Sequence, residues 1–159
     1  LYLYKLYTMK ENQYSKIIKL SLDYHKLSRT FEKVEQAFLT LMICIESMFK
    51  KSDNLWKDTP NIAKLLSETK SDYENILYKF KKNKSNPDFN KYYIEVRNSI
   101  AHGDDLLPTD EIKIKVLELH EYIRKCIIKI LDINDEFELV NYYEDLFTCI
   151  EKKWQNIKM

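Results

Sequence analysis

The amino-acid sequence predicts an all-α protein, a helical bundle with four main helices and short accessory helices. Its 159 residues contain one glycine and three prolines, too few turn-forming residues for an all-β fold, which needs many tight turns. Apolar residues make up 45% of the chain, enough for one domain with a real core. These apolar residues recur at spacings of three and four, the period of a helix with one buried face.

The first predicted helix covers residues 13–27, where tyrosine, isoleucine and serine recur at helical spacing. Before it, residues 1–7 alternate leucine and tyrosine around one lysine, which fits a short strand or the start of a helix equally well. Ser28 or Thr30 is predicted to cap the next helix, because a side-chain oxygen there can accept from the first free N–H groups.

The strongest helical pattern lies at residues 29–50 and predicts a helix apolar enough to be central. Its apolar positions step by three and four without a slip: Phe31, Val34, Phe38, Leu41, Ile45 and Met48. Ser52-Asp53-Asn54 is predicted to end this helix, since such residues favour turns.

Two short helices are expected next. Thr59-Pro60 is predicted to open the first, with proline at its first position, where the missing N–H is not needed. The second starts near Asp72 and finishes in the lysine-rich segment 79–84. Ser85-Asn86-Pro87 then separates it from a helix predicted over 88–102.

The last part of the chain predicts two longer helices after a loop at 104–108. The proline and acidic residues of Pro108-Thr109-Asp110-Glu111 mark the start of a helix over 109–131. Asn134-Asp135 is predicted to break it, and the last helix covers 135–156. The predicted main members of the bundle are therefore the helices at 29–50, 88–102, 109–131 and 135–156.

The sequence is expected to hold one domain. Residues 29–159 form the predicted helical domain, and residues 1–28 an N-terminal segment. Because the chain begins with Leu1 rather than methionine, we expect a fragment or the C-terminal domain of a longer protein, with residues 1–28 as a remnant of it.

Charge and cysteine content narrow the function classes. With 26 basic and 25 acidic residues the net charge is +1, so any RNA contact must come from a local patch. Three cysteines far apart in sequence predict reduced, buried thiols in a cytoplasmic protein: Cys44, Cys126 and Cys149. No apolar run approaches the roughly 18 residues of a membrane span. No cofactor or metal is expected, because His25 and His120 lack ligating residues at a convincing spacing.

One stretch, residues 92–105, gathers side chains that a packed core does not require. On a helix of 100° per residue, one side is the expected core face: Phe89, Tyr92, Tyr93, Val96 and Ile100. A second side gathers four other residues: Ile94, Arg97, Asn98 and Ala101. His102 lies about 40° beyond Asn98. Gly103, the only glycine, is expected to end the helix by adopting positive φ.

Arg97, Asn98 and His102 carry the chemistry that RNA cleavage without a metal requires. His102 titrates near neutrality and can take the proton of a 2′-hydroxyl or protonate the leaving 5′-oxygen. Arg97 is an always-charged bidentate donor for the phosphate oxygens, and Asn98 can orient these groups or bind the phosphate. In the alternative interpretation, His102 only stabilises a helix C-terminus, and Arg97 pairs with a surface acid such as Asp104 or Asp105.

The segment Arg97-Asn98-Ser99-Ile100-Ala101-His102-Gly103 resembles the R-x4-H motif of HEPN domains, and is most similar to the ApeA-like branch linked to prokaryotic antiphage defence. HEPN domains are small helical bundles, many of them metal-independent ribonucleases. The resemblance covers roughly residues 29–131. It implies that Arg97, Asn98 and His102 are catalytic and that the products end in a 2′,3′-cyclic phosphate. It also implies a setting in prokaryotic defence or in a toxin–antitoxin system.

A homodimer is expected through the face of this helix. One imidazole serves as both acid and base only if the proton transfers are sequential, whereas a two-fold dimer would bring a second His102 and Arg97 into one cleft. Dimers are also what the resemblance implies. Ile94 and Ala101, apolar and away from the expected core face, point to such a contact. The alternative, that Ile94 packs against a neighbouring helix of the same chain, is equally open.

Three further features are candidates for supporting roles. Glu46 resembles an acid that the ApeA-like branch often has on this helix, and it is expected to hold Arg97 or His102 in position. Alternatively, it is an acid at the solvent edge paired with a lysine. Tyr93, one turn before Arg97, is a candidate contact for bound phosphate, although its angle on the helix favours packing. The densest basic run is a candidate surface for steering an RNA backbone, or simply a solvated helix end: Lys79, Lys81, Lys82 and Lys84.

The sequence therefore predicts a metal-independent endoribonuclease of the HEPN type that acts on single-stranded or loop RNA. Its expected partners are RNA, a second copy of the chain, and an antitoxin or a larger domain of the same chain; a membrane is not among them. Two alternatives remain. One is a non-catalytic HEPN-like module that binds a nucleotide or a protein, and the other is a structural helical domain whose motif is coincidental.

Overall fold

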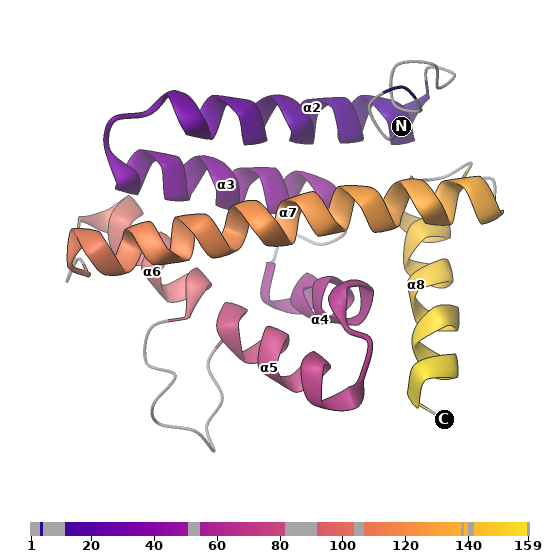
Figure 1. Cartoon of the computed structure of the whole chain (residues 1–159). Helices are drawn as coiled ribbons and strands as arrows, with labels where there is room; N and C mark the ends of the chain where they lie inside the picture. Colours follow the sequence, from indigo (N-terminus) through magenta and orange to yellow (C-terminus); the bar gives the residue numbers. More distant parts are fainter. Residues whose placement is uncertain are drawn as a thin grey trace.

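The computed structural model of the chain describes residues 4, 12–50, 55–81, 92–103, 107–137, 139 and 142–158. These residues form seven α-helices and one 3-10 turn and contain no strand, which confirms the predicted all-α class. The longest helix, α7 (Thr109–Phe137), runs the length of the molecule (Figure 1). Two helices lie alongside it, α2 (Gln13–Leu27) and α3 (Val34–Phe49), and they are joined by the turn η1 (Ser28–Thr30).

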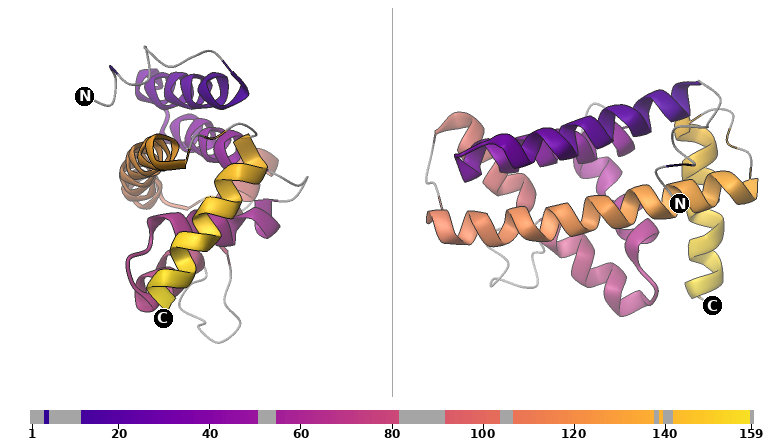
Figure 2. Two further views of the ribbon diagram at one scale, coloured as in Figure 1. Left: turned by 90° about the vertical axis from the view of Figure 1, so that its right-hand side faces the viewer. Right: turned by 45° about the horizontal axis from the view of Figure 1, so that its top comes forward.

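The other helices complete the molecule on the side of α7 away from α2. Figure 2 shows α2 as one layer, α3 and α7 as the middle of the molecule, and α4 (Leu55–Leu66) with α5 (Lys70–Phe80) as the opposite layer. The helix α8 (Tyr142–Lys158) crosses the C-terminal end of α7 steeply. The helix that carries the candidate motif, α6 (Tyr93–His102), lies at the other end of the molecule from α8.

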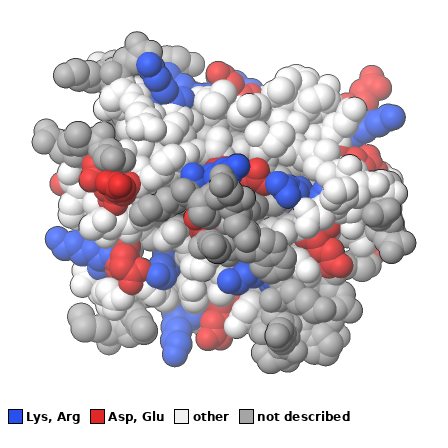
Figure 3. Space-filling model, turned by 180° about the vertical axis from the view of Figure 1, so that it is seen from behind, with Lys and Arg blue, Asp and Glu red and all other residues white. Residues whose placement is uncertain are grey.

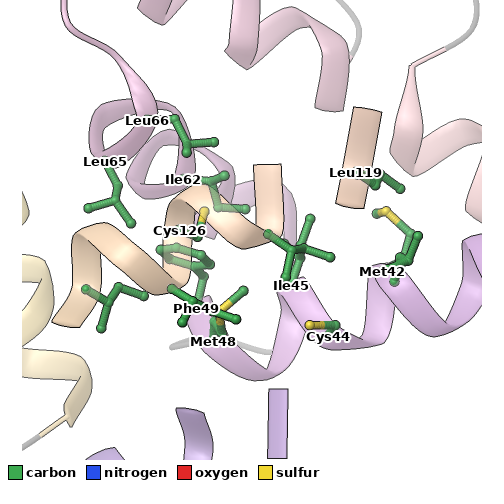
Figure 4. Close-up of a cluster of buried hydrophobic side chains, with 14 of the residues drawn as sticks. Met42, Cys44, Ile45, Met48, Phe49, Ile62, Leu65, Leu66, Leu119 and Cys126 are labelled. Atoms are coloured by element: carbon green, nitrogen blue, oxygen red, sulfur yellow. The ribbon is translucent and has the colours of Figure 1, made fainter. Parts of the chain in front are cut away.

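Helix α3 is central, as its apolar pattern predicted. Nine of its 16 residues are buried, and all of these except Thr40 belong to one hydrophobic cluster with residues of α4 and α7. Figure 4 shows this cluster, with Ile45 and Phe49 of α3 near Ile62 and Leu66 of α4 and Cys126 of α7. Burying one such aliphatic or aromatic side chain stabilises a fold by about 1.5–3 kcal/mol. This packing, rather than helix propensity alone, holds the short helices in place.

Helix α2 belongs to the same core. It spans the predicted residues 13–27, and it begins with a capping box in which Asn12 and Ser15 satisfy each other's backbone N–H groups. Its Tyr14 and Ile18 are fully buried, and the Tyr14 hydroxyl donates to the carbonyl of Ile130 in α7. Tyr14 and Ile18 therefore belong to the same hydrophobic cluster as the helices that follow.

The prediction that Ser28 or Thr30 caps α3 is wrong. Both hydroxyls point back to the preceding helix, because Ser28 donates to the carbonyl of His25 and Thr30 to that of Leu27. They close α2 instead, as serine and threonine do when they bond carbonyls three residues earlier. Helix α3 then begins at Val34, after Lys33, which makes no side-chain capping bond.

Pro60 does not open its helix. It lies inside α4, which starts at Leu55. Proline there removes one backbone hydrogen bond and normally disfavours a helix interior. The buried face of α4, formed by Ile62, Leu65 and Leu66, was predicted correctly, and its burial outweighs the missing bond.

The break predicted at Asn134-Asp135 is also absent. Helix α7 continues to Phe137, six residues beyond the predicted end, and α8 starts at Tyr142 rather than at residue 135. Buried Ile130, Leu131 and Ile133 explain the continuation, since the apolar stripe runs through the polar pair. Tertiary packing here overrides the turn preference of asparagine and aspartate.

The count of main helices differs from the prediction of four. Among the described helices the motif helix α6 is the shortest, with 10 residues, while α2 has 15. Helix α6 begins at Tyr93, later than the predicted residue 88, and Tyr92 is its extended N-cap. The predictions for 1–7, for 52–54 and for 85–87 fall outside the described residues, apart from Tyr4. In the described helices, no segment is both long and apolar enough to cross a bilayer.

Candidate functional site at the end of helix α6

Helix α6 ends where the sequence predicted. Gly103 follows its last residue, His102, with φ of +73° in the left-handed region, and its N–H bonds to the carbonyl of Ile100 at 3.3 Å. No neighbouring atom lies within 4 Å of the place where a Cβ would be, so the backbone conformation alone favours glycine there. The sharp end leaves the last turn of α6 at the surface.

The buried face of α6 is rotated relative to the prediction. Tyr93, Ile94 and Val96 are buried, whereas Tyr92 and Ile100 are only partly buried against the core. Ile94 is 2% exposed and packs in the hydrophobic core of its own chain, so it is not a surface contact for a second copy. Of the two apolar residues expected on a dimer face, only Ala101 is exposed.

The side chain of Arg97 points toward α3 and forms an ion pair with Glu46. Its Nη2 donates to Oε1 of Glu46 at 2.7 Å, and its Nη1 donates to Oδ1 of Asn98 at 3.0 Å. Of the partners considered for Glu46, namely Arg97, His102 or a lysine, the structure shows Arg97, 51 residues away in sequence. The side chain of Arg97 is 38% exposed and that of Glu46 19% exposed, so the guanidinium is held from inside and open to solvent outside. Asp104 and Asp105, the alternative partners, lie outside the described residues.

His102 is exposed on the last turn of α6. It makes no hydrogen bond or ion pair with any residue that the structure describes. Asn98 lies one turn before His102, about 40° away around the helix, and its amide already contacts Arg97. Asn98 and His102 therefore lie close in angle on the last turns of α6, whereas Arg97 lies about 140° from His102 around the helix.

Tyr93 does not face this site. It is 1% exposed, its ring packs edge-on against Phe80 at a centroid distance of 4.9 Å, and its hydroxyl donates to Glu118 of α7. Burial and the Glu118 carboxylate together raise the pKa of the Tyr93 hydroxyl well above its usual value. The expected contact with bound phosphate is therefore wrong. Tyr93 anchors α6 to α5 and α7 instead.

The predicted basic run is only partly described. Lys79 lies 3.6 Å from Glu118 and 5.7 Å from the ring centroid of Tyr122, so its charge is used within the fold. Lys81 is the C-cap of α5, while Lys82 and Lys84 lie outside the described residues. Figure 3 shows basic and acidic side chains interspersed over one face of the molecule. The described part of that face has no broad patch of a single charge.

The hollows with described linings do not include Arg97, Asn98 or His102. The best enclosed is a cavity of about 240 Å³ between α4, α7 and α8, with one lysine from each helix. Two of these lysines already form ion pairs, Lys64 with Glu151 and Lys153 with Glu136. Two further acids line the same cavity. Its charges are balanced, so it does not select an anion.

A pair of histidines is the feature that sequence reasoning missed. Nδ1 of His120 in α7 lies 3.0 Å from Nε2 of His25 in α2, although 95 residues separate them. His25 carried a signal, because it continues the buried stripe of Tyr14, Ile18 and Ser21 at spacings of three and four. His120 gave no such signal in the sequence, since it lies beside the buried stripe of α7 rather than on it.

The cysteines are as predicted. All three are free and buried, and the Sγ of Cys44 donates to the carbonyl of Ser21. Burial raises the pKa of the Cys44 thiol to about 12, so it stays protonated and inert at neutral pH. In the described part of the chain, no three His, Cys, Asp or Glu side chains come together as metal ligands would.

Comparison of the chain with protein-family models, with curated proteins and with solved structures finds no match. The resemblance to HEPN domains therefore depends on the motif residues themselves and on the helix that carries them.

Proposed function

We propose that this chain is a HEPN-type endoribonuclease that cleaves RNA without a metal, with Arg97, Asn98 and His102 as its site. The observation that carries the proposal is the contact of Arg97 with Glu46 and Asn98, on the helix whose last turn exposes His102. An arginine fixed by an acid from a neighbouring helix, on the same helix as an exposed histidine that no described residue pairs with, fits catalysis better than a purely structural ion pair.

Arg97 is suited to bind the phosphate that reacts. A guanidinium has five N–H donors, and described residues engage one at Nη1 and one at Nη2. The remaining N–H groups are able to donate to phosphate oxygens, where negative charge gathers in the transition state. Glu46 and Asn98 reduce the side-chain freedom that phosphate binding would otherwise have to remove.

His102 is suited to move the protons. In the proposed step the ribose 2′-oxygen attacks phosphorus, the bond from phosphorus to the 5′-oxygen breaks, and a 2′,3′-cyclic phosphate forms. The proton of the 2′-hydroxyl goes to a base, and the leaving 5′-oxygen receives one from an acid. One imidazole performs both transfers only in sequence. A second His102 from another copy of the chain would divide them, and such a dimer stays part of the proposal.

The proposed setting follows the resemblance, namely prokaryotic antiphage defence or a toxin–antitoxin system in the cytoplasm. RNA is the substrate, and an antitoxin or a further domain of the same chain is the partner that restrains cleavage. Ile94 is not available for a dimer contact, so a dimer through α6 would use the exposed end that carries Ala101 and His102. Sedimentation at micromolar concentration, with and without His102→Ala, measures that association.

A non-catalytic module is the second candidate, and one observation favours it. Glu46 already neutralises Arg97, and the described site holds a single imidazole, which together suit gripping a phosphate or a partner's carboxylate more than turnover. Incubation of the whole chain with bulk RNA and EDTA separates the two functions. Chelator-resistant cleavage with cyclic-phosphate ends supports the enzyme, whereas saturable binding without products supports the module.

His102→Ala and His102→Gln test the role of the imidazole. Loss of a general acid or base typically slows cleavage by about 100- to 10,000-fold, and glutamine does not restore it because an amide does not titrate. Binding of RNA by His102→Ala should be nearly unchanged, since the phosphate contact belongs to Arg97. Cleavage by both variants at the parental rate would exclude His102 from the chemistry.

A further inference from the structure

Helix α2, the turn η1 and helix α7 meet in a closed ring of hydrogen bonds. Nε2 of His25 lies 3.0 Å from Nδ1 of His120, and the two imidazole rings stand almost perpendicular, at 84° with centroids 4.7 Å apart. Nε2 of His120 lies 3.4 Å from Oγ of Ser28. The Ser28 hydroxyl in turn donates to the backbone carbonyl of His25 at 2.7 Å.

This ring determines where each proton sits. Ser28 has one hydroxyl hydrogen, and it is used on the carbonyl of His25, so its Oγ accepts from Nε2–H of His120. A neutral imidazole carries a single N–H, so Nδ1 of His120 has a free lone pair and accepts from Nε2–H of His25. With both imidazoles neutral, each of these three contacts joins one donor to one acceptor.

The surroundings favour the neutral pair. His25 is 9% exposed and His120 is partly buried, which disfavours a charge on either ring. Arg29 of η1 is the cation that acts on both rings, and no described carboxylate hydrogen-bonds to them. On α7, Glu121 beside His120 is turned to Arg124 at 2.7 Å. On α3, the titratable group that meets α2 is the thiol of Cys44, which burial keeps protonated.

The direction of both titrations agrees with this geometry. Burial first, and then the charge of Arg29, lower the pKa of His25 below its usual value. Burial, the neighbouring His25 and Arg29 lower the pKa of His120 to about 4. A proton on Nδ1 of His120 would also set two N–H groups against each other at 3.0 Å, unless the N–H of His25 moved from Nε2 to Nδ1. A proton on His25 would place a second charge near Arg29 in a buried position.

We propose that this ring is an acid-sensitive clamp, which fastens α2 and η1 to α7 while both imidazoles are neutral and loosens when the pair takes up a proton. The clamp acts on the same half of α7 that supports the motif helix, because Glu118, two residues before His120, receives the hydroxyl of Tyr93 from α6. Loosening at His120 would therefore reach the element to which α6 is anchored. The proposal concerns the fold and does not depend on ribonuclease activity.

The sign of the pH effect follows from linkage. Because both folded-state pKa values are lowered, the unfolded chain binds more protons than the folded chain between about pH 4 and 6.5. Stability is complete above about pH 6.5 and falls as the pH falls through this window. Each proton bound only by the unfolded chain raises the unfolding equilibrium constant by at most about tenfold per pH unit. Solvent access to His120 reduces this limit.

The first test is an NMR titration of the three imidazoles in the unmodified chain. We expect His25 and His120 to titrate below the usual range of an imidazole, and both rings to carry their proton on Nε2 at pH 7.5. Titration of the pair in the usual range, or a proton on Nδ1 of His120, would overturn the proposal.

The second test measures urea unfolding from pH 7.5 to 5.0, above the range in which most carboxylates titrate. His25→Gln and His120→Gln should flatten the pH dependence, whereas His102→Gln, the matched control, should leave it as in the parent. Equal slopes in all four proteins would overturn the clamp. If His120→Gln does not fold, Arg29→Gln provides the same test with both rings intact. Loss of the Arg29 charge should raise both pKa values toward the usual range of an imidazole, and unchanged pKa values would contradict the role given to Arg29.

Discussion

The end of α6 and the junction of α2, η1 and α7 use the same two residue types with opposite results. At the end of α6, Arg97 is paired with Glu46, and His102 faces solvent. At the junction, Arg29 forms no ion pair with a described residue, and it lies near two largely buried imidazoles that hydrogen-bond to each other. The first arrangement leaves the imidazole of His102 at the surface. The second holds the imidazoles of His25 and His120 in hydrogen bonds within the fold.

The difference teaches that the environment of a histidine, rather than its presence, decides what it does. His102 is exposed to solvent. Burial and the charge of Arg29 favour the neutral form of His25 and His120.

The largest expected effect tests whether Arg97 acts on a phosphate. Arg97→Ala should slow RNA cleavage by about 100- to 1,000-fold, since one charged transition-state donor is lost. Arg124→Ala is the matched control, because Arg124 is also an exposed arginine paired with a glutamate on a helix. Cleavage is measured on labelled single-stranded RNA in EDTA. Equal rates for the two variants would reduce Arg97 to a surface ion pair.

The next effect concerns stability at the junction. His120→Ala leaves Nε2–H of His25 and Oγ of Ser28 without their partner, which should cost about 1–3 kcal/mol of unfolding free energy at pH 7.5. His102→Ala should change it by less than about 0.5 kcal/mol, as expected of a surface residue. Urea unfolding measures both. A larger loss of unfolding free energy in His102→Ala than in His120→Ala would contradict the structural role given to His120.

A smaller effect tests Glu46 as the residue that positions Arg97. Glu46→Gln keeps an oxygen for the hydrogen bond from Nη2 but removes the charge, so cleavage should fall about tenfold, less than in Arg97→Ala. Cleavage by Glu46→Asp should fall less than by Glu46→Gln, because aspartate keeps the charge on a shorter side chain. Glu121→Gln, which breaks a comparable pair with Arg124, serves as the control and should retain the parental rate. If Glu46→Gln also retains it, the ion pair contributes nothing to the site.

The smallest effect concerns the end of α6. Gly103→Ala should cost about 1 kcal/mol of stability, because alanine disfavours a φ of +73° although a Cβ meets no neighbour. Gly103→Asn should cost less, since asparagine tolerates the left-handed conformation better. Thermal unfolding of the two variants and the parent checks the order. The same cost for both would point to a side-chain contact rather than backbone strain.

The sequence predicted part of the candidate site, namely the end of the helix that carries it. Gly103 and the spacing of the motif residues located the exposed end of a helix, because a lone glycine after an apolar stripe is a local signal. The rotation of α6 was less accessible. Ile94 sits on the margin of the apolar stripe, and only packing against the neighbouring helices turned it inward and brought Arg97 toward α3. Pro60 and Asn134-Asp135 failed as boundaries for the same reason, because burial elsewhere on the helix outweighed their local preference.

The sequence by itself determined the all-α class, the limits of α2, the central place of α3 and the end of α6. These depend on periodicity and backbone preference, which act over a few neighbouring residues. Only the tertiary structure decided that Glu46 meets Arg97 rather than His102, that Tyr93 is an anchor, and that His25 touches His120. Contacts across 51 and 95 residues depend on how helices rotate and cross, and no local spacing encodes that geometry.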